Sequence, residues 1–264
     1  MLKRIVVGSA IAGASWYAFY RATSYLKGWG VGEGEASLEL PGDDLVAEPS
    51  TKDTRSIRIA APPEAVWPWL VQMGYGRAGW YSYDAMDMKG RSADRILPEL
   101  QQLEVGDTVP TDPGGGFLVR GLDPGHSLVL YADSELIARR REKGPADDAG
   151  PAGLAASGRM LGAGMPEDFA ASWAFVIRPD GAGGTLLIER LQVWLGRQTP
   201  GSRVVGPVLG TGVVLMTRKQ MLGIRDRAEA AGPIQEPVVS QGVEPSNAPS
   251  LAADAPAAPE PVHA

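Results

Sequence analysis

One acidic residue, Glu189, stands where its chemistry would matter. Residues 185–195 alternate as a β-strand does, and Glu189 shares one side of that strand with Leu187 and Leu191. A carboxylate within an apolar surface is costly to bury unless it is paired. If this side faces inward, Glu189 is a candidate to orient a ligand or to act as a general acid or base.

Other kinds of catalytic centre find little support in the sequence. There is no cysteine, which excludes disulfides, thiolate catalysis and cysteine-ligated metals. The two histidines are His126, in an expected turn, and His263, next to the last residue. A serine nucleophile needs a positioned base. A Ser–His–Asp arrangement is therefore not expected, and no catalytic residue is assigned.

The carboxylates of Asp84, Asp87 and Asp94 could in principle bind Ca²⁺ or Mg²⁺ through their oxygens. No EF-hand-like loop accompanies them, and Arg91 and Arg95 are at hand as ion-pair partners. We therefore expect salt bridges here, and neither a metal nor a cofactor.

Aromatic residues form either a core or the wall of an apolar pocket, in which a few polar groups fix the ligand's orientation. Candidates for such polar groups are Tyr83, Asp84, Arg95 and Glu189, and Tyr81 or Tyr83 could donate a hydrogen bond to a substrate carbonyl. The full set of candidate pocket residues is Trp69, Tyr81, Tyr83, Asp84, Arg95, Tyr131, Trp173, Glu189, Met216 and Gln220.

The elements that must position these groups begin near residue 54. Ile57 and Ile59 alternate with polar residues, which predicts a half-buried strand. Pro62 and Pro63 suit the first turn of a helix that ends at Gly74. Residues 80–84 follow as an expected aromatic strand.

The rest of the chain up to residue 231 alternates strands and turns before a final helix. Strand–turn–strand spacing over 106–132 indicates an antiparallel sheet, and 172–195 is expected to be a hairpin around Pro179-Asp180-Gly181. The Gly- and Ala-rich segment 143–168 is either a surface excursion or a lid over a cavity. Residues 211–231 are predicted to form one helix, with an apolar stripe that includes Met216 and Gln220.

The order of these motifs resembles that of the SRPBCC superfamily, the START-like and Bet v 1-like group, in its bacterial polyketide cyclase/dehydrase-like branch. The resemblance rests on Ala-Pro-Pro-Glu-x-Val-Trp after a strand and on the segments 79–84, 92–96, 105–107, 172–175 and 216–229. It implies an α+β protein with the helix-grip fold, in which a curved antiparallel sheet wraps around a long C-terminal helix and a cavity lies between them. It implies no particular reaction.

The two ends of the chain differ from its middle. Lys3 and Arg4 precede an uncharged run over 5–20, which as a helix would be about 24 Å long against about 30 Å of hydrocarbon. We expect residues 1–30 to be a hydrophobic helix that anchors the protein in a membrane by a single pass, on an undetermined side; a cleaved signal peptide and a peripheral helix are the alternatives. The remaining organisation is a linker over 31–53, the helix-grip domain over 54–231 and a disordered Pro/Ala-rich acidic tail over 232–264.

Charge and composition narrow the function. The chain of 264 residues has a net charge of −6, and its dense basic run at 139–143 is expected to be a solvated strand end, so nucleic acid is not an expected partner. The preferred function is binding or transport of a small hydrophobic ligand (lipid, isoprenoid or polyketide-like) near a membrane. A cyclase or dehydratase acting on a hydrophobic substrate and an interaction module without a cavity are the alternatives.

Overall fold

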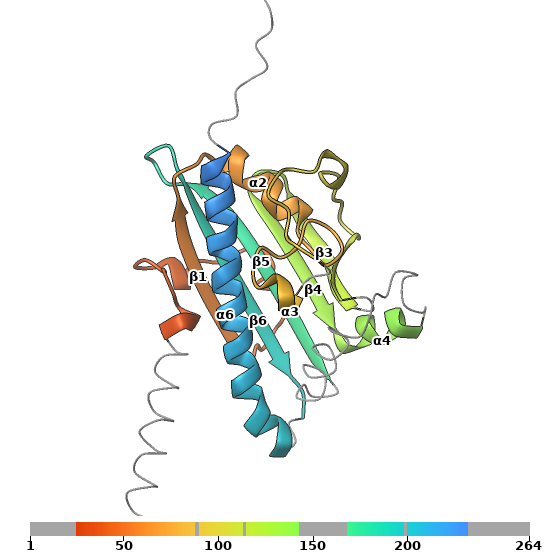
Figure 1. Cartoon of the computed structure of the whole chain (residues 1–264). Coiled ribbons are helices and arrows are strands. Elements are labelled where there is room, and N and C mark those ends of the chain that lie inside the picture. The colour runs from red at the N-terminus through yellow and green to blue at the C-terminus, as the bar shows by residue number, and fades with distance from the viewer. Residues whose placement is uncertain (1–24, 88–89, 113–114, 143–167, 198–199, 232–264) are drawn as a thin grey trace, which may run out of the picture. The chain divides into compact units, whose positions relative to one another are not determined.

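The computed structural model describes residues 25–87, 90–112, 115–142, 168–197 and 200–231. Its centre is an antiparallel sheet in which six strands follow the order β1-β6-β5-β4-β3-β2, with α6 lying across one face (Figure 1). This α+β architecture is the predicted one and is compatible with a helix-grip fold. The strands are β1 (Thr51–Ile59), β2 (Thr108–Asp112), β3 (Gly115–Asp123), β4 (Ser127–Asp133), β5 (Phe169–Pro179) and β6 (Thr185–Leu195).

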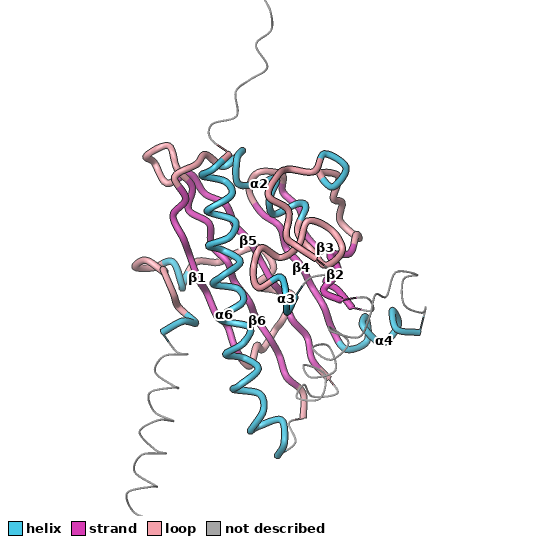
Figure 2. The backbone as a smooth tube through the Cα atoms, viewed as in Figure 1, coloured by secondary structure: helices cyan, strands magenta, loops and turns pink. Residues whose placement is uncertain are grey.

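The helical elements are short except for the last one (Figure 2). The predicted final helix is confirmed and begins earlier than expected. The elements are η1 (Glu35–Ser37), α2 (Pro63–Gln72), α3 (Asp84–Asp87), η2 (Pro98–Leu100), α4 (Ser134–Glu142) and α6 (Pro200–Ala230).

The strand register shows which side chains face the helices. Ile57 of β1 pairs with Leu187 of β6, which pairs with Ile177 of β5, and all three belong to the main hydrophobic core. Side chains alternate between the two faces of a strand. The odd-numbered residues of these three strands therefore face α2 and α6, and the even-numbered ones face the other side of the sheet.

The C-terminal half of α6 is held against the sheet and against the turn that follows β1. Met221, Ile224 and Ala228 are fully buried in the main core. Near the end of the helix, Glu229 Oε1 accepts a hydrogen bond of 2.8 Å from the backbone N–H of Ala60. These contacts fix α6 along β1 and set the depth of the layer between helix and sheet.

Residues 80–84 were predicted to be a strand, and this prediction is wrong. The segment follows an isolated bridge between Gly74 and Gly79 and runs as a loop, in which Tyr81 has a left-handed φ of 57°, into the start of α3. Ser82 Oγ donates to the carbonyl of Met216, so the loop is tied to α6. Trp80 and Tyr81 of this loop are buried in the core instead of pairing in the sheet, whereas Tyr83 is exposed.

The segment before β1 lies on the sheet face opposite α6. We call residues 29–46 the N-terminal strap. Leu40 of the strap packs on Val176 and Ile188, which are even-numbered residues of β5 and β6. Arg190, also on this face, donates to the carbonyls of Ala36 and Leu38. Much of the predicted linker 31–53 is therefore packed structure.

Arg190 continues this network to an acidic residue of the strap. Its Nη1 lies 2.7 Å from Asp43 Oδ2, and its Nε donates to Thr54 Oγ1 at 3.0 Å. Lys52 and Gln192 also bind the Asp43 carboxylate. One buried guanidinium and one carboxylate thus attach the strap to β1 and β6.

Two further predictions need correction. The basic residues 139–141 belong to helix α4 and not to a strand end, because the Asp133 side chain caps that helix through the N–H of Leu136. Within the described residues no helix is long and apolar enough to cross a bilayer, so the prediction of a membrane-anchored protein with a transmembrane helix is wrong for this part of the chain. Most of the predicted anchor (1–24), nearly all of the possible lid (143–167) and the tail (232–264) lie outside the described residues.

Candidate functional site

The helix-facing side of the sheet contains a buried ion pair. Arg55 of β1 pairs in register with Glu189 of β6, and both side chains are completely buried. Arg55 Nη1 donates to Glu189 Oε2 at 3.1 Å. Because Glu189 in turn pairs with Phe175 on β5, the register itself brings this charged pair into the interior layer. The condition set by the sequence is met: Glu189 faces inward.

An aromatic wall stands next to this pair. Trp173 Nε1 donates to Glu189 Oε1 at 2.7 Å, so both carboxylate oxygens have a partner. The Trp173 ring stacks on Trp80, with centroids 5.4 Å apart and planes 16° from parallel. The ring centroids of Phe117 and Phe175 lie 5.5 and 5.0 Å from that of Trp173. The loop that carries Trp80 thereby reaches into the layer between α6 and the sheet.

Several polar atoms in this layer have no hydrogen-bond partner among the described residues. They are Arg55 Nε and Nη2, Trp69 Nε1 and Gln220 Oε1, and each is buried. Buried polar atoms are almost always hydrogen-bonded, so a group left without a partner calls for a specific explanation. A bound molecule with hydrogen-bonding groups is one such explanation.

These atoms come from three elements, of which α6 packs against both α2 and β1. Ser56 N–H donates to the carbonyl of Trp29, and Arg218 Cζ lies 4.8 Å from the Trp29 ring centroid, so the α6 turn around Arg218 is level with residues 55–56 of β1. Gln220 belongs to this turn, and its Nε2 donates to Met73 Sδ at 3.6 Å.

Trp69 lies one helical turn before Met73, on the same side of α2. Buried polar groups of β1, α2 and α6 thus lie on elements that pack against one another.

Tyr81 holds the loop in place, and its hydroxyl is not available to bind a ligand. The Tyr81 hydroxyl donates to the carbonyl of Trp69 at 3.1 Å, and the two rings pack edge to face. Burial raises the pKa of Tyr81, although Gln72 and Arg227 act in the opposite direction. The phenol therefore keeps its proton and its hydrogen bond at neutral pH.

The other candidate residues lie elsewhere. Tyr83 is exposed, and Arg95 is exposed as well, with its carbonyl accepting from Gln72. Asp84 accepts a hydrogen bond of 2.5 Å from Ser92 Oγ. Tyr131 pairs with Ser172 on the sheet face opposite α6. Met216 is half-buried. The structure thus brings Trp69, Trp173, Glu189 and Gln220 together, and their role in binding stays a prediction.

Arg55 is the functional candidate that reading the sequence missed. It has the same parity along β1 as Ile57 and Ile59, the apolar residues of the predicted half-buried strand, so the alternation itself placed a cation on the apolar side. The need of an inward carboxylate for a partner was the second signal.

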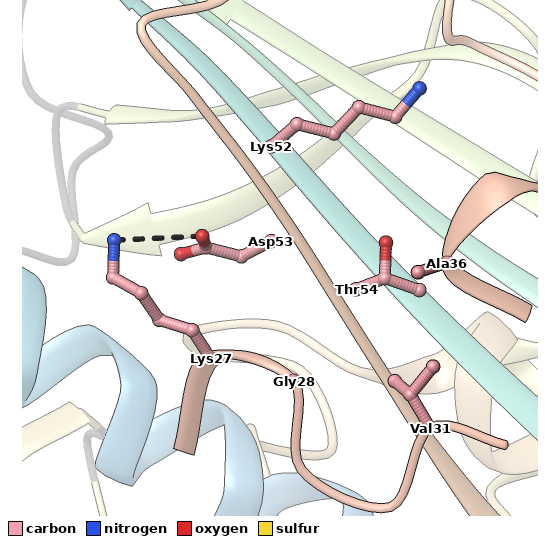
Figure 3. A pocket seen from close by; sticks show the side chains of 7 residues that line it. All are labelled: Lys27, Gly28, Val31, Ala36, Lys52, Asp53 and Thr54. Carbon is pink, nitrogen blue, oxygen red and sulfur yellow. Dashed lines mark ion pairs between the residues drawn. The ribbon is translucent and has the colours of Figure 1, made fainter. Parts of the chain in front are cut away.

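A shallow surface pocket of about 270 Å³ lies along the start of β1 (Figure 3), and Asp53 in its lining has its Oδ2 3.6 Å from Arg55 Nη2. Its charged groups already have partners, because Lys27 Nζ lies 3.5 Å from Asp53 Oδ1 and Lys52 Nζ lies 3.0 Å from Asp43 Oδ2. Its other lining residues are Gly28, Val31, Ala36 and Thr54, and the Thr54 hydroxyl already accepts a hydrogen bond from Arg190 Nε.

Both oxygens of Glu189 accept hydrogen bonds, Oε2 from Arg55 and Oε1 from Trp173. In the part of the chain that the structure describes, no group of three or more His, Asp or Glu side chains is placed to hold a metal.

Comparison with known proteins leaves the family open. No protein-family model matches the sequence, and no curated protein matches it. Among solved structures, a protein from Mesorhizobium loti matches with a TM-score of 0.35 and 16% identity over 68% of this chain and 98% of its own. A conserved protein from Geobacillus kaustophilus gives a TM-score of 0.37 and 15% identity over 69% and 97%. Ara h 8.0201 gives a TM-score of 0.25 and 12% identity over 69% of this chain and 96% of its own. Likeness at this level assigns neither family nor function.

Proposed function

We propose that this protein binds one small, largely apolar molecule in the layer between the sheet and α6, with the polar end of that molecule at Arg55. The observation that carries the proposal is the fully buried Arg55 side chain, whose Nε and Nη2 have no hydrogen-bond partner among the described residues. The resemblance of the sequence to the SRPBCC superfamily supports the same region, since the helix-grip fold binds its ligands between helix and sheet.

Energetic considerations favour a bound molecule over a purely structural role for these groups. A buried donor that lacks an acceptor costs on the order of 1–3 kcal/mol, and more when the group is charged. The free donors of Arg55 and Trp69 and the free acceptor of Gln220 offer both kinds of hydrogen bond. The rings of Trp80 and Trp173 supply apolar surface beside them, as is usual for a small-molecule site.

The proposal is tested on the full chain. Native mass spectrometry of the purified protein, before and after extraction with organic solvent, would detect a molecule that co-purifies. The extracted protein is then titrated with N-phenyl-1-naphthylamine, a neutral apolar fluorophore, while amide hydrogen exchange is recorded. We expect saturable one-to-one binding and slower exchange in β1, in residues 79–82 and in α6 around Gln220.

A matched control addresses binding at the surface. Leu215 is an exposed apolar side chain on α6, with 43% of its surface accessible. Leu215→Ser should leave the affinity for the fluorophore unchanged if the site is internal. The proposal fails if no molecule co-purifies and no saturable binding is found. It also fails if Leu215→Ser abolishes binding, because the fluorophore would then occupy the surface.

A further inference from the structure

The charges around Arg55 determine which polar group a ligand can bring. Arg55 faces two carboxylates: Glu189 Oε2 lies 3.1 Å from Nη1 and Asp53 Oδ2 lies 3.6 Å from Nη2. The second distance is too long for a hydrogen bond, so Nη2 remains a free donor. The Asp53 carboxylate nevertheless offsets part of the positive charge of the guanidinium. Asp53 is also approached by Lys27, whose side chain is 40% exposed.

The charge of the Arg55 guanidinium is thus already neutralised. A ligand carboxylate would be the third negative charge around one guanidinium, and it would be transferred from water to the interior without a counter-ion of its own. Burying an ionised carboxylate is unfavourable unless it is paired. A carbonyl oxygen, in contrast, can accept from Nε and Nη2 without adding charge.

We infer that the ligand group recognised by Arg55 is an uncharged hydrogen-bond acceptor, such as a ketone, ester or amide carbonyl, and that the site discriminates against carboxylates. The inference rests on the proposed function, which places the ligand's polar end at Arg55. It narrows the ligand class to neutral carbonyl compounds with an apolar, ring-sized body that can pack on Trp80 and Trp173. Fatty acids and other apolar acids are excluded in their ionised form.

Three probes that share one ring system test this inference. 2-Acetylnaphthalene carries a neutral carbonyl, 2-naphthoate carries a carboxylate that is ionised at pH 7, and 2-ethylnaphthalene carries no acceptor. Their dissociation constants for the full-length protein at pH 7 are measured by displacement of N-phenyl-1-naphthylamine. We expect the ketone to bind about tenfold more tightly than either of the other two, which corresponds to about 1.4 kcal/mol.

A variant pair links the preference to Arg55. Arg55→Met combined with Glu189→Leu removes both charges with little change in volume, and it should bring the ketone and the hydrocarbon to equal affinity. Arg225→Met combined with Asp226→Leu removes a solvent-facing pair at 2.8 Å on α6 and should leave the tenfold preference unchanged. The infrared carbonyl stretch of bound 2-acetylnaphthalene gives a readout in the wild-type protein alone, since a hydrogen bond to Arg55 lowers its frequency.

The outcomes separate the two proposals. Equal or tighter binding of 2-naphthoate would overturn the neutral-acceptor inference and leave the binding function standing. Equal binding of ketone and hydrocarbon to the wild-type protein, with an unshifted carbonyl stretch, would also overturn it. If none of the three probes nor the fluorophore binds, the proposed function itself fails.

Discussion

Trp173 connects the aromatic wall to the buried charges, and its indole nitrogen can be tested by itself. Trp173→Phe keeps a ring in the stack but removes the 2.7 Å hydrogen bond to Glu189 Oε1. A hydrogen bond to a charged group contributes about 1.5–3 kcal/mol. Trp80→Phe is the control, because its ring stacks on Trp173 and loses a similar area.

We expect Trp173→Phe to lower the free energy of unfolding by about 1.5–3 kcal/mol more than Trp80→Phe, measured by urea denaturation followed by circular dichroism. Equal losses in the two variants would mean that the Trp173–Glu189 hydrogen bond contributes nothing beyond packing.

The Asp43 carboxylate gives the strap a predicted dependence on pH. Burial by itself would raise the pKa of Asp43, but the N–H of Leu40 and the charges of Lys52 and Arg190 outweigh it and hold the pKa below the usual 3.8. A depressed pKa contributes stability that is fully present above the unfolded value and is lost as pH falls through the folded value.

Asp43→Asn should therefore be less stable than the wild type from pH 5 to 7, with a difference that shrinks steadily below about pH 4. The free energy of unfolding of both proteins, measured by urea denaturation between pH 2.5 and 7, checks this expectation. A difference that does not change with pH would show that Asp43 acts through its shape and not through its charge.

At the level of single residues, the sequence indicated part of the site. The alternation of β6 placed Glu189 on one side with Leu187 and Leu191, and the cost of burying a carboxylate meant that, if this side faced inward, Glu189 would need a partner. The identity of that partner depends on which residue of which strand lies opposite. Arg55 and Glu189 are 134 positions apart in the chain, and a one-residue change of register would separate them.

Among the elements, the strap depends on a close approach at Gly30. Gly30 has a φ of 77°, and a Cβ there would lie 1.9 Å from the carbonyl oxygen of Ser56. Gly34 has nearly the same φ, 81°, and nothing within 4 Å of the corresponding position. A side chain at Gly34 would thus introduce backbone strain alone, whereas a side chain at Gly30 would also clash with β1.

Gly34→Ala should cost about 1–2 kcal/mol, the usual penalty of a left-handed conformation. Gly30→Ala should cost clearly more, because the strap must also move away from Ser56. Thermal and urea unfolding of the two variants gives the comparison, and hydrogen exchange of Leu40 and its neighbours reports whether the strap loosens. Equal costs would contradict a tight contact between strap and β1.

The loop over 79–82 shows why an aromatic segment can be misassigned. Its sequence favours a strand, but Gly74, Gly76 and Gly79 all adopt positive φ and turn the chain back on itself. A Cβ at Gly223 of α6 would lie 2.1 Å from the carbonyl oxygen of Tyr81, so helix and loop are in direct backbone contact. Such contacts between distant segments override local β-propensity.

At the level of the whole molecule, the class, the antiparallel sheet and the final helix were predictable because periodicity and turn residues are local signals. The strap was not, since its attachment depends on Arg190 of β6 reaching backbone carbonyls about 150 residues earlier in the chain. The membrane prediction rested on residues 1–30, and the described chain contains no helix that could span a bilayer.

The balance between stability and binding provides the last prediction. A buried ion pair is often no more stabilising than apolar residues of similar volume, and replacing both partners can stabilise a protein by about 1–4 kcal/mol. Removing one partner is different, because it leaves a buried charge alone and costs about 3–5 kcal/mol. Glu189→Ala should therefore be strongly destabilised, whereas Arg55→Met with Glu189→Leu should lose no more stability than Trp173→Phe, because only the hydrogen bond of Trp173 Nε1 is then missing.

Thermal unfolding and urea titration of both variants in the absence of added ligand test this expectation. A double variant that is as stable as Trp173→Phe but no longer prefers 2-acetylnaphthalene would show that the pair is present for recognition, since removing the two charges then adds no cost to the fold. A double variant clearly less stable than Trp173→Phe would instead make the Arg55–Glu189 ion pair part of what holds β1 to β6. The role of Arg55 in binding would then be judged from the wild-type protein alone, by the affinities of the three probes and by the carbonyl stretch of bound 2-acetylnaphthalene.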